Sequence, residues 1–488
     1  MQNFSGWIAE EWTACEKLAR RRGAGVGAAI GGLCAFVGVI AVWGFCVDDA
    51  WIIARVAAHW SAGGGHRFNL EGPVVDAVTP FGYAQLVGAL SDGTALDAFE
   101  TARLVGATGF LLAAIALGLR VGSAGIRRER FLPLALMALS IGMPAWAVAG
   151  METGLVVALV VFGAGPRVQH AALLGLAAAW RPELLPCVVV LALGTGFAAG
   201  GGIRGALVRV LLCLLPAAAM VALRLQLFGV SYPLSFVAKP SDAEHGLRYA
   251  LGGAVFTGGL PLVMGAVSWQ ALSGVGRARF CAVGAHGAAL VLAGGDWMPL
   301  FRLWCPVIPL AVLITAEAFE RGRRWRVALS CVLCLLAVAL PMRAHLNDAR
   351  AVESRRLALV SAAQPLLGGV RVVAALDVGW VGLATPAQIV DLAGVTDPDV
   401  ARLAGGHTSK RLAPDFARRR QLDAAIVLAP AGVRPRIGEP VTPELGSRAV
   451  EQRLLVQLAD LRFRIVGVLP LGGTDQRYLV LRRDEDAE

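Results

Sequence analysis

Long apolar stretches separated by short polar turns make up the chain as far as about residue 344. The first of these stretches runs from about Ala24 to Cys46 and follows a basic cluster between Lys17 and Arg22. It is longer than the apolar part of a cleavable signal peptide, and no small-residue cleavage site follows it. We therefore expect a retained first membrane span whose N-terminus is cytoplasmic.

Basic residues fall in only some of the later turns, and the positive-inside rule assigns those turns to the cytoplasm. Alternating inner and outer turns along the chain predicts about eleven spans and a long first outer loop at 47–97. An apolar segment at about 79–90 does not fit as a span, so we expect an amphipathic helix in the outer interface. The predicted span centres are residues 35, 110, 140, 158, 175, 191, 215, 259, 286, 310 and 335.

Residues 345–488 show a different pattern, in which short alternating runs replace the long apolar stretches. Alternation of apolar and polar residues predicts strands, here at Arg371–Leu376, Ala424–Leu428, Phe463–Leu469 and Tyr478–Leu481. A helical pattern covers Ser447–Leu461, with Ser447 as the predicted N-cap. The expected fold is thus mainly α: a polytopic helical bundle at 1–344, followed by a small extracytoplasmic α/β domain at 345–488.

Composition supports a membrane protein. Of the 488 residues, 56 % are apolar and 16 % charged, whereas soluble domains carry about 25 % charged residues. This balance excludes a cytosolic enzyme, a disordered chain and a disulfide-rich secreted domain. The net charge of +10 comes mostly from residues before 345, so it indicates orientation in a lipid bilayer and no nucleic-acid partner. We expect a multi-pass protein of the inner (plasma) membrane.

The strongest chemical signal is the pair Asp48-Asp49, which directly follows the first predicted span. Two adjacent carboxylates at a membrane boundary are costly unless they face water, a cation or a polar cavity. Neighbouring negative charges raise each other's pKa, which suits one of them to act as a general base. An interfacial pair that merely ends the helix stays open as the alternative.

Further ionisable and aromatic residues fall on the same predicted outer face. Acidic and basic groups next to apolar surface suit a substrate with a charged head and a lipid tail, and arginine grips phosphate with two parallel hydrogen bonds. Helix-end cations that reach lipid headgroups, and an interfacial aromatic belt, remain open for any single one. The candidates are Arg55, His66, Asp76, Glu152, Arg181, Tyr232, Lys239, Asp296, Trp297 and Arg302. No Walker loop, GxSxG or HExxH motif is present, which argues against a nucleotide-driven pump or a serine hydrolase.

Several segments, taken together, make the chain similar to the GT-C membrane glycosyltransferases, which use polyprenyl-phosphate sugars. Among these it most resembles the branch that contains the mycobacterial terminal β-(1→2)-arabinofuranosyltransferases. The segments occur in the order typical of the family and span nearly the whole chain. They are DDAWIIARVAAHW (48–60), HRFNLEGPVVDAVTP (66–80), GMETGL (150–155), RPE (181–183), FGVSYPLSFVAKP (228–240), GGDWMPLFRLWCP (294–306) and VDLAGVTDPDVAR (390–402).

The resemblance implies an inverting transferase in which Asp48 and Asp49 match the catalytic aspartates, one of them deprotonating the acceptor hydroxyl. Basic groups would hold the donor phosphate, and some members of the family use a divalent cation such as Mg²⁺, Mn²⁺ or Ca²⁺. The implied phosphate-binding residues are Lys239, Arg302 and Arg181; the implied substrate-binding residues are Arg55, His66, Asp76, Glu152, Tyr232, Asp296 and Trp297; and the candidate metal ligands are Asp48, Asp49 and Asp296.

The expected activity is transfer of one sugar, with arabinofuranose favoured, to a cell-envelope polysaccharide such as arabinogalactan on the outer face. The residues after Thr79-Pro80 depart from the family pattern, so a GT-C enzyme of different sugar specificity is an alternative. A transporter or flippase of a lipid-linked sugar is another. A flippase would need polar groups at mid-membrane depth and often has an inverted repeat, and neither is visible in the sequence.

Overall fold

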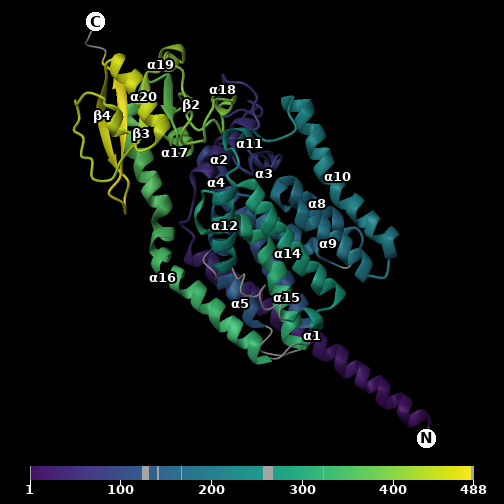
Figure 1. The fold of residues 1–488 in the computed structure, drawn as a ribbon. Helices are drawn as coiled ribbons and strands as arrows, with labels where there is room; N and C mark the ends of the chain where they lie inside the picture. The colour runs from purple at the N-terminus through teal and green to yellow at the C-terminus, as the bar shows by residue number, and fades with distance from the viewer. Residues whose placement is uncertain are drawn as a thin grey trace.

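The structure is a computed structural model that describes residues 2–123, 131–139, 142–165, 167–256, 268–321 and 324–484. It is mainly helical, with α1 projecting from one end of a helical region and a sheet at the opposite end (Figure 1). The α-helices of the helical region are α1 (Gln2–Ala41), α2 (Asp48–Ser61), α3 (Tyr83–Leu90), α4 (Ala95–Ser123), α5 (Phe131–Leu139), α6 (Gly142–Val148), α7 (Thr153–Gly163), α8 (His170–Trp180), α9 (Leu185–Ala198), α10 (Gly202–Phe228), α11 (Leu234–Ala238), α12 (Ala243–Phe256), α14 (Gly274–Ala293), α15 (Ile308–Arg321) and α16 (Arg324–Ala363). Short 3-10 turns are η2 (Pro182–Leu184), η3 (Trp269–Ala271), η4 (Pro299–Val307), η5 (Pro365–Leu367) and η6 (Pro443–Leu445).

Four helices of the described chain are long and apolar enough to cross a membrane: Arg21–Ala41, Ala95–Ser123, Gly202–Phe228 and Pro299–Glu320. A fifth would be the pair α6 and α7, which bends by 115°. These helices match the predicted span centres at 35, 110, 215 and 310, and the bent pair covers 158. The predicted count of about eleven spans is not confirmed.

At two of the other predicted centres the difference arises from helix length, because a span needs about 20 residues. The centres at 175 and 191 fall on α8, which has 11 residues, and on α9, which has 14. Those at 286 and 335 fall on α14 and α16, which are not among the four long apolar helices. The centres at 140 and 259 lie outside the described residues. The segment expected to form an interfacial helix at 79–90 contains α3, whose 8 residues are too few to span.

Glycines allow α1 and α4 to pack backbone against backbone. A Cβ on Gly27 would lie 2.1 Å from the carbonyl oxygen of Gly118, and one on Gly31 would lie 2.3 Å from that of Ala114. This small-residue packing is typical of membrane helices, which gain little from apolar burial against lipid. The packed pair of α1 and α4 supports the first long loop and helix α2.

The C-terminal region forms one five-stranded sheet in the order β2-β1-β3-β5-β4. Strand β1 pairs in parallel with β2 and β3, whereas β5 pairs antiparallel with β3 and β4. The strands are β1 (Val372–Ala375), β2 (Gln388–Asp391), β3 (Ala424–Ala429), β4 (Phe463–Pro470) and β5 (Arg477–Arg483), and the helices are α17 (Val378–Ala384), α18 (Pro398–Ala401), α19 (Phe416–Arg419) and α20 (Ala449–Asp460). Four strands match the predictions and β2 was not predicted. The N-cap of α20 is Arg448, so the prediction of Ser447 is wrong by one residue.

The two faces of the sheet pack against different partners. Alternate residues of β3 show this: Ala425 and Val427 belong to a core formed with α20, while Ile426 and Leu428 belong to the large core that includes α1, α2 and α4. The sheet is therefore joined to the helical region by a continuous apolar core. Helix α16 also connects the two, because it runs through residues 344 and 345 without a break.

Candidate functional site

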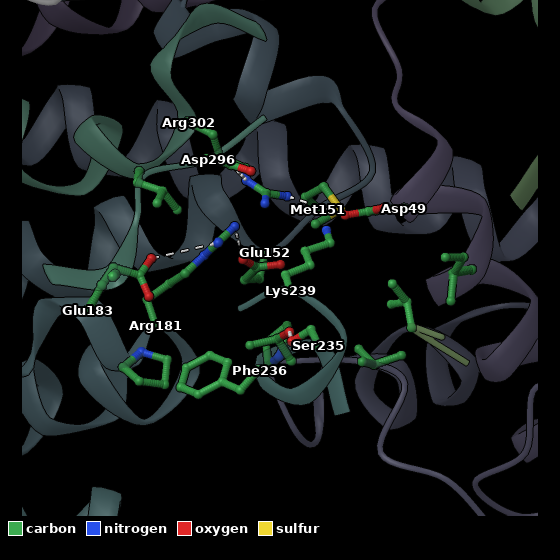
Figure 2. Close-up of a pocket in the computed structure, with 18 of the residues that line it drawn as sticks. Asp49, Met151, Glu152, Arg181, Glu183, Ser235, Phe236, Lys239, Asp296 and Arg302 are labelled. Atoms are coloured by element: carbon green, nitrogen blue, oxygen red, sulfur yellow. Dashed lines mark hydrogen bonds and ion pairs between the residues drawn. The ribbon is translucent and has the colours of Figure 1, made fainter. Parts of the chain in front are cut away.

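A cavity of about 430 Å³ lies where the long first loop, α2, α11 and the turns before α7, α9 and η4 meet. Figure 2 shows charged side chains from these separate segments converging on it. Its walls include apolar residues of α2 and α11, such as Ile52, Ile53 and Phe236. The sequence-predicted residues that line it are Asp49, Glu152, Arg181, Lys239, Asp296 and Arg302.

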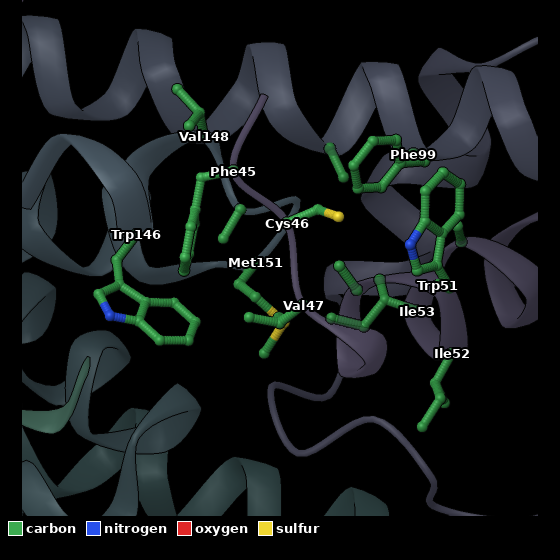
Figure 3. Close-up of a cluster of buried hydrophobic side chains, with 14 of the residues drawn as sticks. Phe45, Cys46, Val47, Trp51, Ile52, Ile53, Phe99, Trp146, Val148 and Met151 are labelled. Carbon is green, nitrogen blue, oxygen red and sulfur yellow. The ribbon is translucent and has the colours of Figure 1, made fainter. Parts of the chain in front are cut away.

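Buried apolar side chains surround the start of α2 (Figure 3), the helix that carries Asp49. Trp51 stacks on Phe99 at a centroid distance of 3.8 Å, and Phe45 meets Trp146 edge to face at 5.5 Å. The Asp49 side chain is 26 % exposed and forms an ion pair with Arg302 at 3.7 Å. The Asp49 carboxylate is thus partly exposed and lines the cavity, at the start of a helix that is packed against buried apolar side chains.

Arg302 lies between two carboxylates of the cavity. Its Nε donates to Asp296 at 2.8 Å, its Nη1 lies 3.7 Å from Asp49, and its guanidinium lies over the Trp146 ring at 5.2 Å. Burial would raise the pKa of Asp296, but the positive charges of Arg302 and Lys239 outweigh it and hold that pKa below its usual value. Asp296 is therefore ionised at neutral pH.

Unusual backbone geometry brings the side chains of Asp296 and Arg302 together. Gly294 and Gly295 end α14 with φ angles of 85° and 70°, values that favour glycine. Leu300 and Phe301 also have positive φ angles, of 59° and 50°, immediately before Arg302. Such strained conformations in non-glycine residues concentrate at functional sites.

Arg181 is enclosed by acidic groups. It forms an ion pair with Glu152, whose side chain is 0 % exposed, and lies 3.7 Å from the Glu183 carboxylate. Glu152 reaches this position because the chain turns at Gly150, where a Cβ would lie 2.8 Å from the Phe99 ring. The positive charge of Arg181 is therefore largely neutralised within the protein.

Lys239 is the exception among the cations of the cavity. It follows α11, which is tied to the first loop by a Leu234 N–H that donates to the Asp76 carbonyl at 3.2 Å and by a Thr79–Ser235 hydroxyl contact of 3.0 Å. Within the described chain the Lys239 ammonium makes no hydrogen bond and no ion pair. Its charge lowers the pKa of Asp296, but no carboxylate of the described residues forms an ion pair with it, so it can meet an anion that enters the cavity.

Asp48 does not line the cavity. Its carboxylate accepts hydrogen bonds from the backbone N–H groups of Gly379 at 2.8 Å and Trp380 at 3.0 Å, at the start of α17. Burial, followed by the nearby Asp377 carboxylate, raises the pKa of Asp48 to about 7. The two adjacent aspartates therefore have different surroundings and face different parts of the protein.

Five predicted substrate-binding residues also lie outside the cavity lining, and two of them, Arg55 and Asp76, make buried contacts elsewhere. Arg55 is buried and donates to backbone carbonyls of Phe68, Thr385 and Ala387 at 2.9–3.2 Å. Asp76 forms a buried ion pair with Arg224 at 2.7 Å. These residues join parts of the protein to one another.

His66 stacks on Phe81 at 5.6 Å and its Nδ1 contacts the Val75 carbonyl at 3.3 Å. Tyr232 is 45 % exposed and does not line the cavity either. Neither residue contributes to the lining of the cavity.

Trp297 lies next to Asp296 and is 62 % exposed. Its ring stacks on His245 at 4.0 Å and lies 5.7 Å from the ring of His407, which belongs to the C-terminal region. Burial and the charge of Lys239 lower the pKa of His407 to about 4, so this ring is neutral at physiological pH. Val395 of the same region lines the cavity. Val395 falls within the family-like segment 390–402 but was not a candidate site residue, and His407 lies in none of these segments, because the proximity of both to the cavity depends on how the sheet packs.

The three candidate metal ligands do not form one site. Asp48 is bonded to backbone N–H groups, and Asp296 is bonded to Arg302. Within the described part of the chain, no three His, Cys, Asp or Glu side chains are placed to hold a metal ion. The residues present do not fit a divalent cation bound by these aspartates.

The fold and the cavity together define a mainly helical protein with several potential membrane spans and a charged cavity, to whose lining the C-terminal region contributes Val395. Comparison with known proteins finds no match to this chain among family models, curated proteins or solved structures.

Proposed function

We propose that the chain is an inverting glycosyltransferase that moves one sugar, arabinofuranose in our first choice, from a polyprenyl-phosphate donor to a cell-envelope polysaccharide on the outer face of the membrane. The observation that carries this proposal is that Asp49 and Lys239 line the same cavity. Asp49 is a carboxylate that accepts no hydrogen bond from the described residues, and Lys239 is a cation that forms no hydrogen bond and no ion pair with them. A base and an anion-binding group are what this reaction requires.

In the proposed reaction, the Asp49 carboxylate takes the proton of an acceptor hydroxyl as its oxygen attacks the anomeric carbon of the donor sugar. The bond from that carbon to the phosphate oxygen breaks on the opposite face, and its electron pair leaves with the polyprenyl phosphate. The configuration at the anomeric carbon is inverted. Asp49 then releases the proton to water, and a phosphate leaving group needs no acid of its own.

The cations of the cavity differ in how well they can bind the donor phosphate. Lys239 has no competing carboxylate in contact, whereas Arg302 is shared between Asp296 and Asp49, and Arg181 between Glu152 and Glu183. We therefore assign the main phosphate contact to Lys239 and a secondary one to Arg302. Apolar residues of the cavity wall, such as Ile53 and Phe236, suit the first isoprene units of the lipid.

The acceptor would approach from the side of Trp297. An exposed indole offers an apolar face on which a sugar ring can stack, and the neighbouring His245 and His407 offer polar edges. This arrangement supports a saccharide acceptor between the helical region and the sheet region.

The test uses full-length wild-type protein and Asp49→Asn in nanodiscs, each given a panel of polyprenyl-phosphate sugars and a short glycan acceptor. Mass spectrometry detects the extended glycan. We expect transfer by the wild type and a loss of at least about 10²-fold in Asp49→Asn, the scale of a lost general base. Glu71→Gln is the matched control, because it removes an exposed carboxylate from the same loop. Transfer by Asp49→Asn at the wild-type rate would remove this residue from the mechanism.

A transporter of lipid-linked sugars is the second candidate, because the structure holds a second charged cavity of about 520 Å³. Helices α7, α9, α14 and α15 each run from the first cavity to the second, so the two lie at opposite ends of the helical region. The second cavity is lined by residues that include Arg120, Arg209, Arg279, Glu317 and Glu320.

Between the cavities these four helices bury apolar side chains, including Val156, Val188, Val283 and Ile314. A polar path for a phosphate would have to cross this core, which favours the transferase. Movement of a donor between liposome leaflets, without glycan extension by any donor, would reverse that preference.

A further inference from the structure

The two aspartates at the start of α2 are adjacent in sequence, and successive residues of a helix point about 100° apart. Asp49 therefore faces the cavity while Asp48 faces the C-terminal region. Both residues belong to the first turn of α2, which is packed against an apolar core where Trp51 stacks on Phe99. A shift or rotation of this turn would move the Asp49 carboxylate together with Asp48.

The contact between α2 and α17 is close and includes groups at both ends of α17. Asp48 accepts hydrogen bonds from the N–H groups of Gly379 and Trp380, which begin α17 and have no partner within it. Seven residues, or two turns, later on the same face of α2, Arg55 donates to the carbonyls of Gly382 and Thr385. Asp48 and Arg55 thus hold the two ends of α17.

Gly379 shows how little room this contact leaves. A Cβ at this position would lie 2.1 Å from the backbone oxygen of Asp48 and 2.9 Å from its carboxyl carbon. No side chain fits there unless α17 moves away from α2. The first loop is bound to the same region a second time, because Asn69 and Ile389 exchange two hydrogen bonds, of 2.9 and 3.0 Å.

The C-terminal region in turn fixes the position of α17. Asp377, the residue before this helix, accepts hydrogen bonds from Arg448 at 2.8 Å and from the Tyr478 hydroxyl at 2.7 Å. Arg356 of α16 donates to the same hydroxyl at 3.2 Å. The start of α2 is therefore connected through α17 to α16 and to strand β5.

We propose that the C-terminal region positions Asp49 for proton abstraction through the contact of α17 with Asp48. Asp48 is then a positioning residue and Asp49 is the base, and transfer requires the C-terminal region to be docked on α2. This inference rests on the proposed transferase function. Its physical basis is that a displacement of about 1 Å of a reacting group can lower a rate by about 10²-fold.

The test compares Gly379→Ala with Gly368→Ala in the full-length protein in nanodiscs. Gly368 lies in the same region with φ at −58°, and a Cβ there would lie an ordinary 3.5 Å from its nearest neighbour. We expect Gly379→Ala to lower kcat about 10- to 100-fold with donor KM changed less than about twofold, because the residue touches no cavity group. Hydrogen exchange in α2 and α17 should become faster. Gly368→Ala should match the wild type in both measurements.

Asp48 variants give a second line of evidence that does not depend on tolerance of Gly379→Ala. An asparagine can accept one of the two hydrogen bonds and an alanine neither, so Asp48→Asn should retain more activity than Asp48→Ala. The acid limb of the kcat–pH profile should stay in place in Asp48→Asn, because the base is Asp49. Equal inactivation of both Asp48 variants with unchanged hydrogen exchange would make Asp48 a base and overturn the proposal.

The two proposals fail in different ways. If the wild type transfers no sugar, the transferase function fails, and the positioning role fails with it. If the wild type is active and Gly379→Ala accelerates hydrogen exchange without changing kcat, only the positioning role is overturned.

Discussion

Replacement of Lys239 separates ligand binding from protein stability. Its ammonium forms no hydrogen bond and no ion pair with the described residues, and what Lys239→Gln removes is the longer-range attraction that lowers the pKa of Asp296, so the free energy of unfolding should change by less than about 1 kcal/mol. Loss of a hydrogen bond to a charged phosphate costs about 1.5–3 kcal/mol. At 1.4 kcal/mol per tenfold, kcat/KM for the donor should fall roughly 10- to 150-fold.

Arg181→Gln is the matched comparison, because this cation is already paired. Its removal leaves Glu152 buried without a positive partner, and breaking such a pair costs about 3–5 kcal/mol of stability. The assay measures the thermal unfolding midpoint and the donor concentration dependence of transfer for both variants. Unchanged donor kcat/KM in Lys239→Gln, or a drop in its unfolding midpoint as large as that of Arg181→Gln, would refute the assignment.

Two further predictions concern ionisable groups outside the cavity. Arg224→Gln should lower the stability by about 3–5 kcal/mol, because it leaves Asp76 buried and unpaired. Arg248→Gln, which breaks an exposed ion pair, should lower it by less than about 1 kcal/mol, and thermal unfolding of both variants measures the difference. Burial and the Asp377 carboxylate raise the pKa of Asp48 to about 7, so the folded state binds the Asp48 proton more tightly than the unfolded state does. The stability that this proton contributes is therefore full below about pH 4 and is lost as the pH rises through 7. Asp48→Asn should therefore flatten the dependence of the unfolding midpoint on pH between 4 and 8, and an unchanged slope would contradict this origin.

Much of the candidate site could be predicted from the sequence, because its members stand at the ends of apolar stretches. Asp49, Lys239 and Arg302 come from three segments that are far apart in the sequence, yet the pattern predicts each of them as a polar group at the outer boundary. What could not be predicted is which of two adjacent aspartates faces the cavity. That depends on the rotation of α2, which its contact with α17 determines.

The spans were harder to predict for a related reason. Apolar stretches rich in Ala, Gly and Val have the composition of membrane helices, but the turn at Gly150 and the short helices α8 and α9 interrupt them. A hydropathy average over about 20 residues does not detect such breaks, whereas the length of each helix depends on where they fall. Strand β2 was missed because its four residues are too few to show alternation.

The unbroken helix α16 limits how this protein could be rebuilt from parts. Its 40 residues, at about 1.5 Å each, form a rod roughly 60 Å long that fixes the rotation of the sheet region as well as its distance. Inserting a single residue between Arg324 and Glu353 would turn the sheet by about 100° about the helix axis and misalign α17 with α2. A chimera with a foreign C-terminal region must therefore preserve helical phase as well as sequence order, and a flexible linker in place of α16 would lose both.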